Sequence, residues 1–267
     1  MLKDITIGQY YKADSVIHRL DPRVKLMGTL IFIISLFMGM NIWIYAVVTV
    51  ALAVVIKMSR IPLKFMVRGL KSIVILIIIS AVFNLFLTPG DVLIQIWKLT
   101  ITYQGLKMAI FMVVRLIYLI VGTSLMTLTT TPNNLTDGLE KGLGFLKVIK
   151  VPVHEIAMMM SIALRFIPIL IEETDKIMKA QMARGADFEN GSLIKRAKAM
   201  VPILVPLFVS AFRRANELAM AMEARCYHGS EGRTKMKPLK YEKRDRIAYI
   251  SMVLYLGVII IVKIIVA

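Results

Sequence analysis

The chain is almost uninterruptedly apolar from Val24 to Ile56, and this stretch is the strongest constraint on its fold. As one helix it would be about 50 Å long, whereas a bilayer core needs only about 20 apolar residues, or roughly 30 Å. Residues 39–41 (Gly-Met-Asn) offer a turn, and Lys25 and Lys57 flank the stretch. We therefore expect a tight hairpin of two membrane spans whose outer ends lie on the same side.

Three further apolar segments have the character of spans. They are about Ser72 to Leu87, Leu106 to Leu128 and Ile247 to Val266. Hydrophobic residues make up 58% of the chain, which is too high for a soluble domain of this length. The sequence thus predicts an all-α integral membrane protein with about five transmembrane helices, divided into a four-helix membrane domain (1–128), a cytoplasmic domain (129–245) and a final span (246–267).

The distribution of lysine and arginine predicts the orientation. The N-terminal arm to residue 25 and the loop 57–71 hold five each, and the region 129–246 holds twenty. The loops on the opposite side hold none and two, the latter being Lys98 and Lys107. Basic residues collect in loops that stay in the cytoplasm, so this distribution places the N-terminus inside. It also explains the net charge of +17 without nucleic-acid binding, for which no basic–aromatic motif is present.

One charge lies inside a predicted span. Arg115 falls in the fourth span, where a guanidinium facing lipid would be costly. We expect it to face a neighbouring helix or a wet crevice, in a structural role.

The cytoplasmic region 129–245 predicts helices rather than further spans. A short helix should run from Thr131-Pro132 to about Gly142 or Gly144, because proline is favoured in a first helical turn. A long helix should run from Val151-Pro152 to Arg184, and a second should begin near Ser192. Pro202 and Pro206 are expected to break this second helix in the middle.

The same short motif closes both long helices. Ala180 to Gly185 (AQMARG) is echoed by Ala221 to Cys226 (AMEARC), forty-one residues further on. Arginine offers five fixed donors and stays charged when partly desolvated, and a helix C-terminus favours a positive charge. Two such tips in one frame predict docking of two equivalent partners. The candidate site residues, three from each copy, are Ala183, Arg184, Gly185, Ala224, Arg225 and Cys226.

On these paired motifs, placed at the ends of long helices beside apolar spans, nearly the whole chain resembles the transmembrane T component (EcfT, CbiQ-like) of energy-coupling factor transporters, ABC-type importers of vitamins and metal ions. The first copy matches the family's Ala-Arg-Gly, and the second departs from it at Cys226. The resemblance implies a multi-pass subunit of a prokaryotic cell membrane with no cofactor. It implies two ABC ATPase subunits, each receiving one arginine, and a small membrane-embedded substrate-binding S component packed on the apolar surfaces.

Other functions find little support in the sequence. No G-x-x-x-x-G-K-[ST] phosphate loop occurs, so ATP hydrolysis by that route must belong to a partner. An integral-membrane enzyme would need acids or histidines near the membrane interface; the available acids form no such motif, and three scattered histidines have no metal-ligand spacing. A conventional ABC permease that binds its own cargo is the alternative to the T component. The acids and histidines considered for the enzyme are Asp137, Glu140, Glu172, Glu173, His18, His154 and His228.

Overall fold

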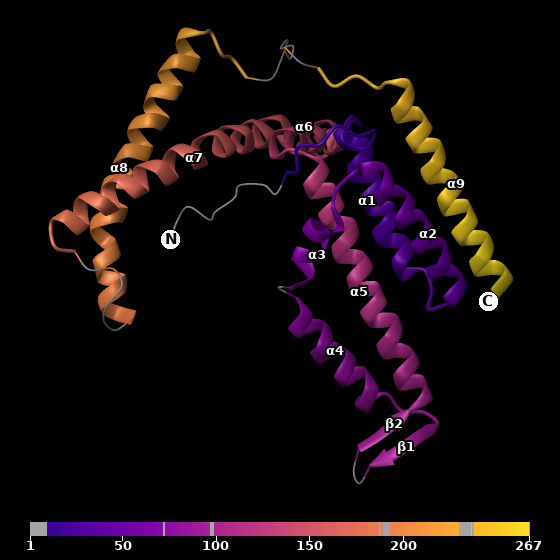
Figure 1. Cartoon of the computed structure of the whole chain (residues 1–267). Helices are drawn as coiled ribbons and strands as arrows, with labels where there is room; N and C mark the ends of the chain where they lie inside the picture. The colour runs from indigo at the N-terminus through magenta and orange to yellow at the C-terminus, as the bar shows by residue number, and fades with distance from the viewer. Residues whose placement is uncertain are drawn as a thin grey trace. The chain divides into compact units, whose positions relative to one another are not determined.

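The computed structural model describes residues 10–71, 73–96, 99–186, 188, 193–229, 236 and 238–266. The chain divides into two compact units. The bundle unit comprises residues 8–138 and 239–267, and the crossed-helix unit comprises residues 1–7 and 139–238. Apart from one short hairpin, the elements described are helical (Figure 1).

The bundle unit contains the predicted helical hairpin. Helix α1 (Pro22–Phe37) and α2 (Ile42–Ser59) are separated by a break that covers the predicted turn. Asn41 caps α2, because its side-chain oxygen accepts a hydrogen bond from the backbone N–H of Trp43 at 3.3 Å. Side chains from α1 and α2 then pack with Ile259 of α9 (Lys243–Val266) in a buried apolar cluster.

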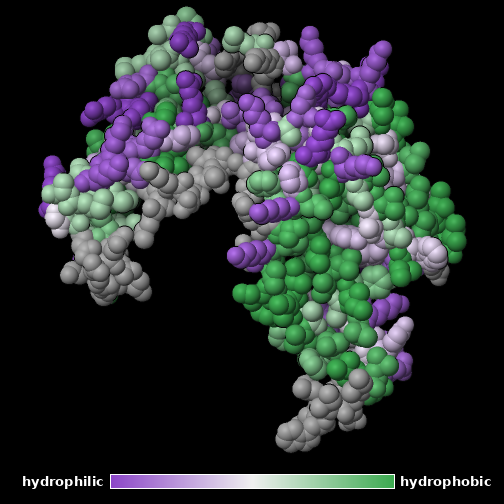
Figure 2. All heavy atoms as spheres, viewed as in Figure 1, coloured by the Kyte–Doolittle hydropathy of each residue, from purple (hydrophilic) through white to green (hydrophobic). Residues whose placement is uncertain are grey.

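The third predicted span corresponds to α4 (Val74–Leu87) alone, whereas the predicted inside loop 57–71 contains a further helix, α3 (Leu63–Lys71). α3 is short and amphipathic, and α4 is apolar throughout. The predicted first residue of this span, Ser72, lies outside the described residues. Helix α5 (Tyr103–Thr129) contains the fourth predicted span. Figure 2 shows hydrophobic side chains along the bundle helices and hydrophilic ones gathered where α1 and α9 begin.

A β-hairpin that the sequence analysis did not predict connects α4 to α5. Strand β1 (Val92–Ile96) pairs antiparallel with β2 (Leu99–Thr102). Thr102 then caps α5, because its hydroxyl accepts a hydrogen bond from the N–H of Gly105 at 3.0 Å and donates one to the carbonyl of Thr88 at 2.8 Å. Lys98, counted above, lies outside the described residues.

The number of candidate spans agrees with the sequence. Within the described residues, four helices are long and apolar enough to cross a membrane, and α3 with α4 makes a fifth if this bent pair is one span. The predicted all-α fold with about five spans is therefore confirmed. The four include α7 (Val153–Ala183), whose apolar first half gives it the length and composition of a span. α1, with 16 residues, is shorter than a typical span.

Arg115 faces neighbouring helices, as predicted. Its side chain is buried in the bundle, and its Nε donates a hydrogen bond to the Tyr45 hydroxyl of α2 at 3.0 Å. The guanidinium also lies over the ring of Phe37, 5.0 Å from the centroid. These contacts keep the charge away from lipid and join α5 to α1 and α2.

The crossed-helix unit contains the long helices predicted for residues 129–245. α6 (Pro132–Gly142), which begins in the bundle unit, has the predicted bounds, and a short 3₁₀ helix, η2 (Gly144–Ile149), leads towards α7. α8 (Leu193–Ala224) follows α7; its predicted N-cap, Ser192, lies outside the described residues.

The predicted break in α8 is wrong, because the helix continues through Pro202 and Pro206. A proline has no N–H, so Pro206 leaves the carbonyl of Pro202 without its intrahelical donor. Gln181 of α7 reaches this carbonyl with its side-chain amide, at 3.5 Å. A tertiary contact thus replaces part of what the prolines remove, and the sequence of α8 gave no sign of it.

One buried carboxylate ties the two ends of the bundle sequence together. Asp245, fully buried in the first turn of α9, accepts hydrogen bonds from the backbone N–H of Asp21 at 2.9 Å and of Glu242 at 2.8 Å. Asp21 in turn caps α1 and pairs with Arg23 at 2.9 Å. The starts of α1 and α9 are therefore held by one side chain.

Replacing Asp245 should weaken the bundle. Asp245→Ala leaves two backbone N–H groups without their acceptor, which should cost about 2 kcal/mol and lower the thermal midpoint of the chain in detergent. Glu242→Ala is the matched control, because it removes only an exposed carboxylate paired with Arg244 and should change the midpoint little. Equal midpoints for the two variants would contradict this role of Asp245.

Candidate functional site

The two sequence motifs occupy equivalent places in the structure. Arg184 is the C-cap residue of α7, and Arg225 directly follows the last residue of α8. In each case the alanine before the arginine closes the helix and the small residue after it leaves the helix. Both copies of the motif are therefore helix C-termini, as predicted.

Both helices end with the same pattern of hydrogen bonds. After α7, the N–H of Gly185 bonds to the carbonyl of Met182 at 2.9 Å, and that of Ala186 to Gln181 at 3.0 Å. After α8, the N–H of Cys226 bonds to the carbonyl of Glu223 at 2.8 Å, and that of Tyr227 to Met222 at 3.0 Å. Each pair of bonds is a Schellman motif, which satisfies carbonyls that the end of a helix leaves free.

This hydrogen-bonding pattern explains why glycine is favoured as the third residue of the motif. The Schellman motif needs a left-handed residue just after the helix, and φ is +88° at Gly185 and +54° at Cys226. Glycine adopts this conformation without cost, whereas a residue with a Cβ is strained by about 1–2 kcal/mol. The departure from glycine at Cys226 therefore strains the end of α8 but leaves its geometry unchanged.

The arginine side chains are available to an external partner. Arg184 and Arg225 are both exposed, and neither makes an ion pair with any other residue that the structure describes. Ala183 and Ala224 beside them are also exposed. Each tip therefore combines a free guanidinium with a small neighbour, so that another surface can approach the helix end closely.

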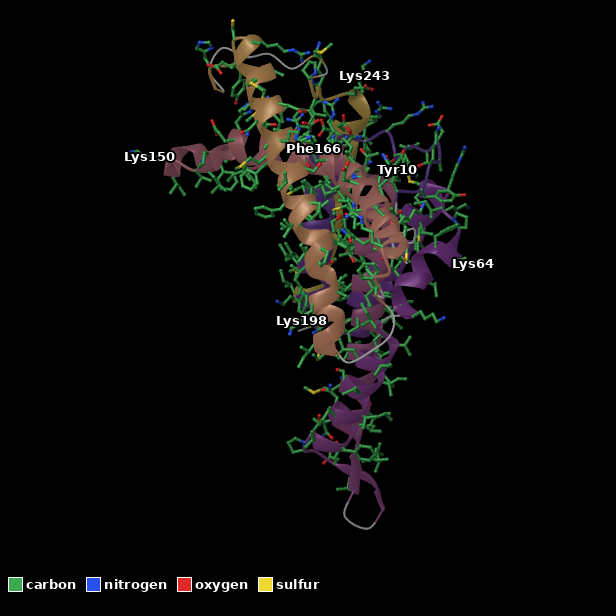
Figure 3. All side chains as sticks on the ribbon, turned by 90° about the vertical axis from the view of Figure 1, so that its left-hand side faces the viewer. Tyr10, Lys64, Lys150, Phe166, Lys198 and Lys243 are labelled. Atoms are coloured by element: carbon green, nitrogen blue, oxygen red, sulfur yellow. The ribbon has the colours of Figure 1, made fainter. Side chains whose placement is uncertain are left out.

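Helix α8 crosses α7 within the crossed-helix unit, so the two tips are parts of one assembly (Figure 1). A groove of about 270 Å³ lies along the crossing, lined from α7 by Ile162, Phe166 and Leu170. Phe166 is labelled in Figure 3. Across the groove, Arg214 of α8 donates a hydrogen bond from Nη2 to Oε2 of Glu173 at 3.0 Å.

The acidic residues considered for catalysis do not form a site. Glu173 pairs with Arg214, and Glu140 pairs with His154 at 2.9 Å. Glu172 is exposed on α7, while Asp137 belongs to α6. Among the described residues, no group of three or more His, Cys, Asp or Glu side chains is placed to hold a metal ion.

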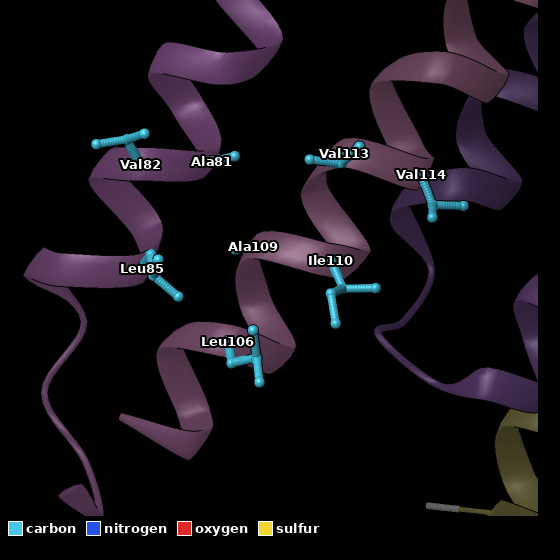
Figure 4. Close-up of a pocket in the computed structure, with 8 residues that line it drawn as sticks. All are labelled: Ala81, Val82, Leu85, Leu106, Ala109, Ile110, Val113 and Val114. Carbon is cyan, nitrogen blue, oxygen red and sulfur yellow. The ribbon is translucent and has the colours of Figure 1, made fainter. Parts of the chain in front are cut away.

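A second groove lies in the bundle unit, between α4 and α5 (Figure 4). It has a volume of about 320 Å³ and is lined only by aliphatic side chains. The residues are Ala81, Val82, Leu85, Leu106, Ala109, Ile110, Val113 and Val114. Such a lining offers no hydrogen bond to a hydrophilic cargo, so this groove suits hydrocarbon rather than a vitamin or an ion.

The sequence analysis identified the arginine tips but not the contact that joins their helices. From the sequence, Glu173 is considered only as a candidate acid, and Arg214 is assigned no role. A signal was present, because the two residues are forty-one positions apart, like the motifs themselves.

The cap geometry predicts opposite effects of glycine at the two helix ends. Gly185→Ala adds a Cβ at a left-handed position and should destabilise the end of α7 by about 1 kcal/mol, while Cys226→Gly should stabilise the end of α8 by a similar amount. Amide hydrogen exchange of the last helical turns measures both changes. Gly142→Ala is the control, because a Cβ there meets nothing within 4 Å and the backbone is not left-handed. If Gly185→Ala changes amide exchange at the end of α7 no more than Gly142→Ala changes it at the end of α6, then a Cβ at residue 185 causes no backbone strain.

Comparison with known proteins agrees with the motifs and the fold. The family described as cobalt transport protein (CbiQ) matches residues 13–236. The chain is 57% identical to the energy-coupling factor transporter transmembrane protein EcfT of Clostridium kluyveri over 250 residues, which are 93% of each chain. The proteins of the same name from Bacillus subtilis and Lactococcus lactis are 47% and 42% identical, over 95% of this chain and 96% of theirs. The chain therefore belongs to the EcfT/CbiQ family, the non-catalytic, multi-pass transmembrane components of bacterial energy-coupling factor transporters.

Proposed function

We propose that Arg184 and Arg225 each dock into one of two ABC ATPase subunits and carry the motion of these subunits to the membrane. The observation that supports this most strongly is the identical construction of the two helix ends: the same cap, the same hydrogen bonds and the same exposed arginine. A guanidinium at a helix end can make paired, charge-assisted hydrogen bonds to an acidic groove, and such bonds hold their geometry under load. Two equal tips suit two equivalent ATPases.

The transported substrate in this proposal belongs to a separate S component. The exposed face of α8 is strongly apolar, with Val201, Leu204, Val205, Phe208 and Phe212 each more than half exposed. The groove in the bundle unit is also apolar, so neither surface suits a hydrophilic cargo. An apolar face of this size favours a hydrophobic partner protein, and we assign it to the S component, whose tilting would release a vitamin or metal ion inside.

The coupling helices act, in this proposal, on the cytoplasmic side. The excess of lysine and arginine supports a cytoplasmic N-terminus and a cytoplasmic coupling domain at residues 129–245. α7 then begins in the apolar zone with Met158, Met159 and Ile162, and its charged second half extends towards the ATPases. The apolar middle of α8 lies at the membrane boundary.

Reversing both tip charges tests the coupling. In the assembled transporter, Arg184→Glu together with Arg225→Glu should reduce ATP-driven uptake at least tenfold, because each acidic groove would now face a like charge. Uptake into proteoliposomes and co-purification of the ATPases measure the effect. Arg165→Glu on α7 is the control, since it changes the same charge far from either tip. Full uptake by the double variant would contradict the proposal.

The orientation can be tested without engineering a cysteine, because Cys226 is the only one in the chain and is exposed. A membrane-impermeant maleimide should label it in inverted vesicles but not in right-side-out vesicles. In a Cys226→Gly background, Lys263→Cys near the end of α9 should show the opposite pattern, since this one span separates the two labelled positions. Labelling of Cys226 from outside would reverse the proposed topology.

A further inference from the structure

The forty-one-residue relation between the two motifs extends into the helices that carry them. Position 173 of α7 corresponds to position 214 of α8, and position 172 to position 213. The charges at these equivalent positions are opposite: Glu172 and Glu173 on one helix, Arg213 and Arg214 on the other. The duplication is therefore complementary in charge at this point, whereas at the tips it repeats the same charge.

Equivalent positions meet where the helices cross. Glu173 contacts Arg214 through the 3.0 Å ion pair, and Leu170 lines the same groove as Ala211, its own counterpart. In a pair of helices related by a twofold axis, only residues close to the axis contact their own counterparts. The ion pair between counterparts therefore places the crossing point near Glu173 and Arg214.

The crossing point lies at equal distances from the two tips. Glu173 and Arg184 are eleven positions apart in the sequence, and so are Arg214 and Arg225. At about 1.5 Å per residue, each arm is roughly 16 Å long. Equal arms require that the two helices keep one register, because a slip of one helical turn would move one arginine by about 5 Å relative to the other.

The apolar packing at the crossing offers little to fix that register. α8 presents Ala211, Ala215 and Ala219 at a spacing of four residues to the groove, and such small side chains allow close approach at several neighbouring registers. Polar contacts are different, because each is satisfied at only one register. The Gln181 amide meets the Pro202 carbonyl at 3.5 Å, and the stronger contact is the charged 3.0 Å pair of Glu173 with Arg214. Its side chains are about one-third exposed, so its contribution to stability is small, but a charge pair can still specify alignment.

We propose that the Glu173–Arg214 pair is the positioning contact that fixes the register of α7 against α8. It thereby holds Arg184 and Arg225 at equal distances from the crossing point, which is what we call matched reach. The proposal rests on the proposed function for the importance of matched reach, but the register itself is a property of this chain alone. Glu173 and Arg214 act through the two tips and do not touch a partner.

The register can be measured as a distance between two spin labels. Lys179 and Met220 are exposed and forty-one residues apart, five residues before the two tip arginines. With Cys226→Gly to remove the native thiol, Lys179→Cys and Met220→Cys provide the labels in the full chain in lipid nanodiscs. Pulsed electron–electron double resonance then gives the distribution of distances between the two spin labels.

Charge reversal and charge exchange separate pairing from general damage. Glu173→Arg or Arg214→Glu alone should broaden the distribution or shift it by about 5 Å, and the double exchange should return it to the unmodified width. Glu172→Arg is the matched control on the neighbouring residue; it is exposed, makes no ion pair within the described part of the chain, and should change nothing.

Two results would overturn the proposal. Distributions that stay unchanged in both single variants would show that packing alone fixes the register, and a double exchange that fails to restore the distance would show that the two residues do not act as a pair. Neither result depends on the ATPases. The variant with both tip charges reversed could therefore keep its uptake, which would contradict the proposed function, while the register inference still holds. Equally, the register inference could be wrong while the proposed function holds.

Discussion

The end of a helix leaves its last carbonyls without partners, and the two docking tips proposed above depend on how α7 and α8 meet that constraint. Both continue for one residue in the left-handed conformation, which turns the backbone N–H groups back onto Met182 and Gln181 in α7 and onto Glu223 and Met222 in α8. The arginine before this turn is thereby fixed at the end of a rigid rod. A flexible end would let the same charge follow a moving partner without transmitting force.

The bundle unit solves a different problem, which is to join apolar helices with few polar contacts. Hydrophobic side chains provide little preference between one helix pairing and another when hydrocarbon surrounds them. The contact of Arg115 with Tyr45 satisfies a polar group that could not face lipid, and Asp245 joins the starts of α1 and α9. These contacts are few, and each connects elements far apart in the sequence.

Several features of the fold could be predicted because they depend on local chemistry. The turn after α1, the start of α6 at Pro132 and the helix ends at the two motifs follow from residues that lie next to one another in the chain. The continuity of α8 could not be predicted in this way. Pro202 and Pro206 argue locally for a break, and the compensating donor, Gln181, comes from another helix. The hairpin before α5 was missed for a related reason, since its strands have mixed composition and pair only with each other.

The sequence by itself determined the class of protein, the approximate number of candidate spans and the two arginine tips, because hydropathy, charge and a repeated motif are all readable along the chain. Only the structure showed that the residue after each arginine is left-handed, and that Glu173 meets Arg214 where the two helices cross. A contact between residues forty-one positions apart depends on how two helices pack. No local pattern of side chains specifies that packing, whereas a helix end is specified by the few residues that form it.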